Sequence, residues 1–321
     1  MFCPSFLLLI FNSKPLIIAD KEGRALVIFV GGPHNDSSWK EVVRRAQETM
    51  ASVRLEGLEA DALPLSVQSH RRGEFVALPV GVSHGNGRLQ PGNLIQPLER
   101  QKLVDRLLSD PSIQRIAGYQ SSLFSYYAPK LYAHFCLRLH RLFDHDKSLI
   151  GNFVNSVFPA TSFNLGPRTV SLDHTDAGNV GYGLCALVSL GTFDSRKGGH
   201  LVLFDLGLMV PFPSSSVALL PSGILRHGNT TIQAGEERYS IAQYCAGGLF
   251  RWVEYGYKAA TALTGRKSKA KTKKSVLTTL YGTHEERVEG ALGLFSTVDA
   301  LASDRVSTFR GFASWLRPKK R

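Results

Sequence analysis

The stretch LDHTDAGN at residues 172–179 decides the fold, together with a second stretch, PSGILRHGN, at residues 221–229. His174 and Asp176 are two residues apart, so on an extended segment both side chains point to the same side. His227 follows Asp176 by 51 residues. Two histidines and one carboxylate suit an Fe(II) ion that keeps open positions for a bidentate co-substrate and for dioxygen. We therefore predict that these three residues are the catalytic metal ligands.

A co-substrate of this kind, 2-oxoglutarate, needs a cation beside its distal carboxylate. Arg238 lies 11 residues after His227 and opens the run RYSIAQY, in which Ser240 shares the strand face of Arg238 at i+2. Asn164 precedes His174 by ten residues in FNLGPRTVSLDHTD. The spacing predicts Arg238 as the anchor of 2-oxoglutarate, with Ser240 and Asn164 as polar partners.

The sequence around these motifs reads as short strands, because apolar or alternating runs are separated by Gly, Pro, Asn and Asp from about residue 152 onward. Expected strands cover residues 162–165, 169–172, 184–190, 200–204, 208–212, 216–220 and 238–244. Such a series predicts a barrel or a sandwich. After a strand over 25–30, the upstream region shows helical spacing over 97–109, over 126–146, and after Ser38, where Ser38 and Glu41 predict a capping box. The fold class is thus α+β, with helices of residues 25–148 packed on a β core of residues 149–258.

The 321-residue chain carries a formal charge of +12, but residues 265–321 hold 13 Lys and Arg against five Asp and Glu. Residues 259–321 therefore predict a basic linker and tail, with a helix over 285–302. The four cysteines are scattered without a CxxC pair, which argues against a zinc module and against a disulfide framework. The apolar run FLLLIF is too short to span a bilayer, so we expect no membrane association and leave residues 1–24 unassigned.

Several blocks of the sequence resemble the TET/JBP family of Fe(II)- and 2-oxoglutarate-dependent dioxygenases, in particular its basidiomycete fungal, transposon-associated branch. The resemblance covers about residues 27–257, and its blocks are SHRRGEFVALPVGVSHGNG, RIAGYQSSLFSYYAPKLY, FNLGPRTVSLDHTD, KGGHLVLFDL, LLPSGILRHGN and ERYSIAQYCAGGLFRWV. It implies a double-stranded β-helix, or jelly-roll, core. It also implies oxidation of the methyl group of a modified nucleobase, usually 5-methylcytosine in DNA, with Fe(II), 2-oxoglutarate and O2.

An enzyme of this kind must extrude its target base from the duplex and hold the phosphates with positive charge. Asn179 and Tyr182 are candidates for contacting the flipped base, by hydrogen bonding and by stacking. The candidates for binding the phosphates are the basic residues His70, Arg71, Arg72, Arg168 and Arg226. We expect a monomer that acts in the nucleus.

Other interpretations of the same residues stay open. The chemistry of the site also fits N6-methyladenine, RNA or a protein side chain as substrate. An inactive transposon-linked copy that only binds nucleic acid is a further alternative, and the intact ligand set argues against it. A cupin-like metalloprotein without 2-oxoglutarate would have no need for Arg238.

Overall fold

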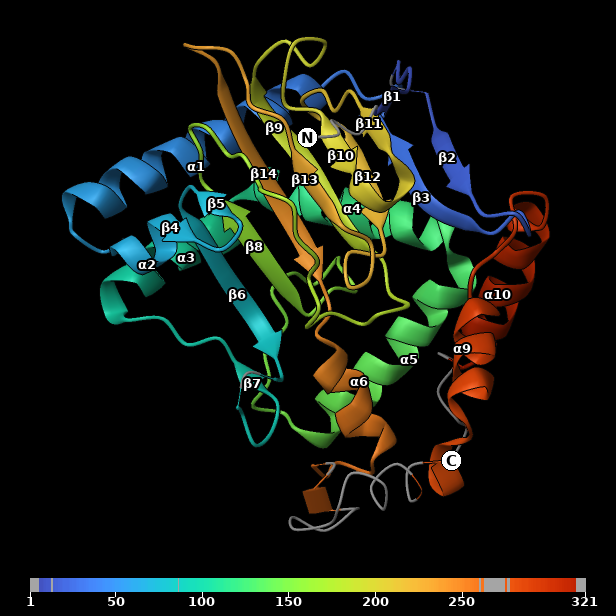
Figure 1. Cartoon of the computed structure of the whole chain (residues 1–321). Helices are drawn as coiled ribbons and strands as arrows, with labels where there is room; N and C mark the ends of the chain where they lie inside the picture. Colours follow the sequence, from blue (N-terminus) through green and yellow to red (C-terminus); the bar gives the residue numbers. More distant parts are fainter. Residues whose placement is uncertain are drawn as a thin grey trace, which may run out of the picture.

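The computed structural model describes residues 6–12, 14–85, 87–259, 261–262, 275 and 278–315. A large antiparallel sheet forms its centre (Figure 1). In order across this sheet, the strands are β2 (Leu16–Ala19), β3 (Ala25–Val30), β12 (Val217–Leu220), β9 (Cys185–Thr192), β14 (Glu237–Tyr244), β8 (Ala160–Asn164), β6 (Ala77–Ser83) and β7 (Gly92–Asn93).

A smaller sheet faces the large one. Its strands are β1 (Leu7–Leu8), β11 (Leu208–Val210), β10 (Leu201–Leu203) and β13 (His227–Asn229). Strand β1 pairs in parallel with β11, whereas the other two pairs are antiparallel. The apolar N-terminal segment that the sequence left unassigned thus supplies an edge strand to each sheet, β1 to the small one and β2 to the large one.

Both faces of the large sheet are covered, because its central strands alternate between two apolar clusters. In β3, Ile28 and Val30 belong to the cluster under the helices, whereas Val27 and Phe29 belong to the cluster between the two sheets. Strands β9 and β12 alternate in the same way. A strand buried on both faces is apolar at nearly every position, as ALVIFV is.

The helices pack mainly on the outer face of the large sheet and beyond its edges (Figure 1). They are α1 (Trp39–Glu59), α2 (Leu65–Gln68), α3 (Leu98–Ser109), α4 (Pro111–Tyr127), α5 (Pro129–His145), α6 (Gly247–Glu254), α9 (His284–Leu292) and α10 (Leu301–Trp315). Two sheets face to face with helices on one outer side make the predicted α+β, double-stranded β-helix architecture. None of the helices in the described ranges is long and apolar enough to cross a bilayer.

The predicted helix over 126–146 forms as α5, although it begins only at Pro129, whereas the sequence did not predict α4 before it. Asp110 caps α4, since its carboxylate accepts hydrogen bonds from the backbone amides of Ser112 and Ile113. The capping box at Ser38 does not form, because the Ser38 hydroxyl donates to the nearby carboxylate of Asp36.

The predicted strand over 169–172 is also wrong. Only an isolated bridge between Arg168 and Arg238 forms there, so this stretch runs as a loop toward His174. The remaining strands lie where they were expected, with ends shifted by one or two residues, except that residues 204–206 form a 3-10 turn, η1 (Phe204–Leu206), after β10.

The predicted boundary near residue 149 does not divide the sheet. Strands β3 and β6 come from the N-terminal region and pair directly with β12 and β8 of the expected core. The described part of the expected tail is packed as well. Ala25 donates its backbone amide to the Ser296 carbonyl, and α10 lies along α5 (Figure 1). The basic run GRKSKAKTKK, residues 265–274, lies outside the described residues.

Candidate active site

A two-way backbone pairing brings the two predicted histidine ligands together. The amide of His174 donates to the carbonyl of His227 over 3.1 Å, and the amide of His227 donates to the carbonyl of His174 over 2.9 Å. The amide of Asp176 donates to the carbonyl of Ser222 over 2.8 Å. The loop after residue 169 is therefore pinned to β13 and to the turn before it, and this fixes all three side chains from the backbone.

The ligand atoms of His174, Asp176 and His227 all lie within 4.8 Å of one another, as one metal ion requires. The Nε2 atoms of His174 and His227 lie 3.8 and 3.9 Å from the Asp176 carboxylate oxygens. Each imidazole directs Nδ1 at a backbone carbonyl, that of Leu172 at 2.7 Å for His174 and that of Leu225 at 2.9 Å for His227. Such a bond places the proton on Nδ1 and leaves Nε2 free to bind a metal. Burial, and next the proximity of His227, lower the pKa of His174, which favours the neutral form that binds metal.

Arg238 is the largest fully buried side chain of the described structure, with 1% of its surface exposed. Burial lowers its pKa to about 10, so the guanidinium keeps its charge at neutral pH. Its Nη1 donates to the Thr169 carbonyl over 2.9 Å, but Nε and Nη2 have no hydrogen-bond partner among the described residues. No carboxylate in the described ranges forms an ion pair with it. A buried cation without a counterion is costly in free energy. This slot therefore fits an anionic group, which would supply the missing negative charge and accept hydrogen bonds from Nε and Nη2.

A row of polar side chains continues from Arg238 across three strands. Ser240 pairs in register with Asn164 of β8 and with Ser189 of β9. The Asn164 amide donates to the Ser240 hydroxyl over 2.9 Å, and the buried Ser189 hydroxyl has no partner in the described structure. Ser240 lies at i+2 from Arg238, on the same face of β14. The two predicted polar partners of the anion slot are thus brought together, and Ser189 adds a third that the sequence analysis did not identify.

A cavity of about 490 Å³ opens beside Asp176. The residues that line it are Ser66, Val67, His70, Arg71, Arg72, Ala77, Pro79, Ser162, Asp176, Gly178, Asn179, Cys185, Ala242 and Tyr244. The volume lies within the range of roughly 300–1,000 Å³ typical of small-molecule sites. Asn179 donates to the Ser222 hydroxyl over 3.0 Å, and Arg71 reaches the Thr175 carbonyl at 3.3 Å. Of the predicted substrate contacts, Arg71, Arg72, Asn179 and their neighbour His70 lie in this wall.

The other three predicted substrate contacts do not line this cavity. Tyr182 packs against the main core, and its hydroxyl lies 3.2 Å from Nε2 of His134. Arg168 reaches the Ile232 carbonyl at 3.3 Å. Arg226 is engaged on the surface by Asp173 and Asp205. The roles expected for these three residues remain predictions.

Nine of the lining residues were not identified by the sequence analysis, although strand alternation offered a signal for two of them. Ala242 and Tyr244 stand at i+4 and i+6 from Arg238 and therefore share its face. Burial raises the pKa of Tyr244 to about 12, so this residue offers a neutral hydroxyl. Cys185 has a pKa raised to about 12 by burial, so its thiol is not ionised at neutral pH.

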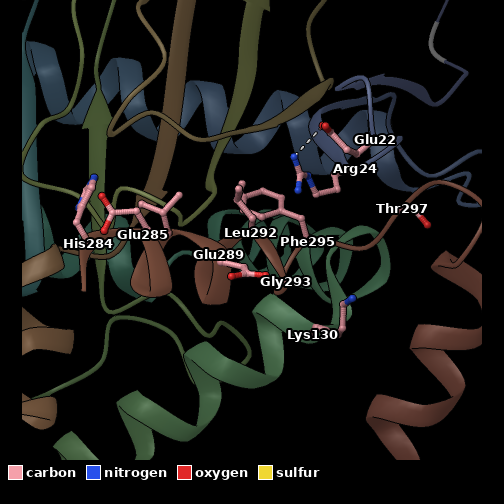
Figure 2. A pocket seen from close by; sticks show the side chains of 11 residues that line it. Glu22, Arg24, Lys130, His284, Glu285, Glu289, Leu292, Gly293, Phe295 and Thr297 are labelled. Carbon is pink, nitrogen blue, oxygen red and sulfur yellow. Dashed lines mark hydrogen bonds and ion pairs between the residues drawn. The ribbon is translucent and has the colours of Figure 1, made fainter. Parts of the chain in front are cut away.

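A larger hollow of about 700 Å³ lies between α9 and the turn before β3 (Figure 2). It contains none of the predicted site residues. Its arginine and lysine are engaged by acidic neighbours: Arg24 pairs with Glu22 at 2.9 Å, and Lys130 pairs with Asp304 at 3.2 Å. Because these two cations already have acidic partners, in contrast to Arg238, nothing in the hollow indicates an anion-binding site.

Comparison with solved structures supports the fold. A structure described as NgTET1 in complex with 5mC DNA superposes with a TM-score of 0.51 and 16% identity, over 76% of this chain and 83% of that one. The chain shares the fold of NgTET1. An oxidoreductase of the 2OG-Fe(II) oxygenase family from Burkholderia pseudomallei matches with a TM-score of 0.32 and 16% identity, over 65% of this chain and 92% of that one. No family model and no curated protein matches the chain. The predicted α+β fold with a double-stranded β-helix core is confirmed.

Proposed function

We propose that the chain is an Fe(II)- and 2-oxoglutarate-dependent dioxygenase. The observation that carries this proposal is the buried guanidinium of Arg238, which has two unpartnered nitrogens and no counterion among the described residues. It shares a strand face with Tyr244, which lines the cavity at Asp176. One strand face thus connects the metal site with the anion slot. This arrangement fits 2-oxoglutarate, which chelates a metal with its 2-oxo acid end and carries a second carboxylate at the other end. The cupin-like alternative leaves the charge of Arg238 unexplained.

The residues of the chain have distinct tasks in this reaction. When bound, Fe(II) with 2-oxoglutarate and O2 supplies the oxidant that hydroxylates a C–H bond, while the co-substrate becomes succinate and CO2. His174, Asp176 and His227 would hold the metal, with Nδ1 of each imidazole fixed on a carbonyl. Arg238, with Ser240 beside it, would hold the distal carboxylate by charge-assisted hydrogen bonds. The apolar cluster between the sheets keeps bulk water from this slot.

We further propose that the substrate is the methyl group of a modified nucleobase, with 5-methylcytosine in DNA as first choice. The likeness to NgTET1, described with 5mC DNA, supports this choice. The cavity wall supports it as well, because Arg71 and Arg72 place positive charge beside the site. A duplex base would have to be flipped to enter the cavity, at a cost of a few kcal/mol. The resemblance of the sequence blocks to the fungal, transposon-associated TET/JBP branch supports the same choice.

A panel assay tests both proposals. The purified full chain is incubated with Fe(II), 2-oxoglutarate and ascorbate, together with oligonucleotides that carry 5-methylcytosine or N6-methyladenine in duplex DNA, single-stranded DNA and RNA. Digestion to nucleosides and mass spectrometry then identify the product. We expect an oxidised 5-methylcytosine that depends on 2-oxoglutarate and is lost in His174→Ala. If only N6-methyladenine or only RNA is oxidised, the proposed substrate is wrong and the proposed enzyme class stands. Absence of any 2-oxoglutarate consumption would favour a nucleic-acid-binding copy.

The basic run at residues 265–274 supports a proposed nuclear location. It contains six Lys and Arg residues. A tagged full chain should accumulate in the nucleus, and a variant with these six residues changed to Gln should not. If the tagged full chain and the Gln variant have the same distribution in the cell, the proposed nuclear signal is wrong, and the assignment of the active site is not affected.

A further inference from the structure

One short segment between α1 and β6 supplies five of the residues that line the cavity. Residues 65–74 form α2 and the small hairpin of β4 (Ser69–His70) and β5 (Gly73–Glu74), which lies beside β6 in Figure 1. The segment is fastened to the loop that carries His174. Leu172 donates its amide to the Arg72 carbonyl over 2.6 Å, and a Cβ on Gly73 would lie 2.3 Å from the Val170 carbonyl oxygen. The hairpin therefore has a fixed position relative to the metal ligands.

His70 stands out within this segment because both of its ring nitrogens are buried and neither has a hydrogen-bond partner in the described structure. The ring packs edge-on against Phe75, with centroids 4.7 Å apart and planes at 88°. The imidazole is thus held in place by an apolar contact, while the nearby Phe75 backbone meets neither ring nitrogen with normal hydrogen-bond geometry. Buried polar atoms without hydrogen bonds cost free energy, so this arrangement fits a ligand that forms hydrogen bonds with the ring nitrogens.

The imidazole of His70 is neutral at physiological pH. Burial is the largest cause that lowers its pKa, and the charges of Arg72 and Arg71 lower it further, against a smaller opposing effect from the Phe75 backbone. A neutral imidazole offers one N–H donor and one acceptor lone pair. Arg71 and Arg72 offer donors only. His70 is thus the member of this basic trio able to accept a hydrogen bond, for example from the exocyclic amino group of a cytosine.

We propose that His70 is a substrate-contacting, specificity-determining residue that hydrogen-bonds the polar edge of the base held in the cavity. The proposal rests on the proposed nucleobase substrate and deepens it. It assigns to His70 a role different from the phosphate contact expected from the HRR sequence. Arg71 and Arg72 keep that role, since guanidinium groups suit phosphate oxygens.

The first test is the substitution His70→Phe, which keeps an aromatic ring against Phe75 and removes both nitrogens. We expect the KM for a 5-methylcytosine oligonucleotide to rise about tenfold or more, because a polar group of the base loses its partner. The KM for 2-oxoglutarate should change much less than the KM for the oligonucleotide, since the anion slot at Arg238 is not altered. His70→Gln should recover part of the loss. His140→Phe, at an exposed histidine of α5, is the matched control and should behave as wild type. An unchanged oligonucleotide KM in His70→Phe overturns the proposal.

A second test uses the wild-type protein and needs no variant to fold. Histidine labelled with 15N in the ring gives NMR resonances that report each imidazole separately, whether or not the nitrogens are exposed. In the metal-free protein, the methylated oligonucleotide should shift the ring resonances of His70 and leave those of His140 in place, whereas 2-oxoglutarate alone should not shift them. His70 resonances that stay in place when the oligonucleotide binds contradict the assignment. If the wild type oxidises no nucleobase in the panel assay, the proposed substrate fails and this assignment fails with it. Oxidation together with unshifted His70 resonances overturns the assignment of His70 alone.

Discussion

His174 and His227 exchange backbone hydrogen bonds of 3.1 and 2.9 Å, and their rings stand 4.3 Å apart. Residues separated by 53 positions in the sequence are therefore held side by side by the backbone itself. Preorganisation of this kind means that the affinity for iron depends on the backbone around the ligands as well as on the ligands.

Gly228 gives a direct test of this dependence. A Cβ at Gly228 would lie 2.7 Å from the Ser171 carbonyl oxygen, so Gly228→Ala must push the loop before His174 away from β13. We expect the affinity for Fe(II) to fall about tenfold or more, measured by anaerobic titration. Gly181→Ala is the control, because its Cβ would meet its nearest neighbour at 3.6 Å. Equal iron affinity in the two variants would show that the backbone pairing does not control the site.

The substitution Arg238→Met distinguishes the role of Arg238 in binding the co-substrate from its effect on the unfolding free energy. The methionine keeps much of the apolar stem and removes a buried charge that has no counterion in the described structure. We expect the unfolding free energy without ligand to stay level or to rise, since an uncompensated buried charge is lost. The stabilisation by 2-oxoglutarate, about 2.7 kcal/mol for wild type at a hundred times Kd, should disappear. Thermal unfolding with and without 2-oxoglutarate or N-oxalylglycine measures both effects.

The control for this experiment is Arg196→Met, because Arg196 is an exposed arginine. It should keep the full ligand-induced shift. If Arg238→Met keeps that shift too, the anion slot lies elsewhere.

We expect His134 to account for part of the loss of folding stability at acidic pH. Burial, with a smaller effect from Arg138, lowers its pKa to about 4, below the value of about 6.5 expected in the unfolded chain. Between these values the unfolded chain binds a proton that the folded protein does not, so stability falls as the pH drops from about 6.5 to about 4. In urea unfolding between about pH 7 and about pH 5, His134→Phe should lose less stability than wild type. His140→Phe should lose as much as wild type, and equal losses in all three proteins would refute the role of His134.

The C-terminal helices α9 and α10 lie in the region that the sequence predicted as a basic linker and tail, and α10 packs against the folded body. Leu301 of α10 is 6% exposed, whereas Val306 of the same helix is 51% exposed. Leu301→Ala should therefore lower the unfolding free energy by about 2 kcal/mol or more. Val306→Ala should change it by less than about 0.5 kcal/mol. Equal and small effects in chemical denaturation would show that α10 does not contribute to the stability of the core.

The sequence indicated a metal-ligand set because the chemistry itself constrains residue types and spacing. The structure brings the HxD pair and the later histidine together, and it pairs Asn164 with Ser240. These residues lie on strands and strand ends whose alternation is visible locally. Strand β3 and helix α1 were predicted for the same reason, since each carries a regular apolar pattern.

The elements that sequence analysis missed carry polar or structure-breaking residues in their interior. Helix α4 buries Gln120, whose amide donates to the carbonyls of Ala186 and Ile241, and this polar residue interrupts the apolar stripe. Strand β6 contains Pro79 and Gly81, which normally argue against an interior strand. The cavity wall was hidden for a different reason. His70 belongs to a separate two-stranded sheet and meets Tyr244 of the large sheet in one cavity only through tertiary packing, which local patterns do not encode.

The most direct test of the central claim is anaerobic spectroscopy of the purified protein with Fe(II) and 2-oxoglutarate. Chelation of Fe(II) by the 2-oxo acid produces a visible charge-transfer absorption that neither component gives alone. We predict that wild type shows this absorption, that His174→Ala, Asp176→Ala and His227→Ala each lose it, and that Arg238→Met requires far more 2-oxoglutarate to reach it. Full absorption at the wild-type 2-oxoglutarate concentration in any of these four variants would contradict the site described here.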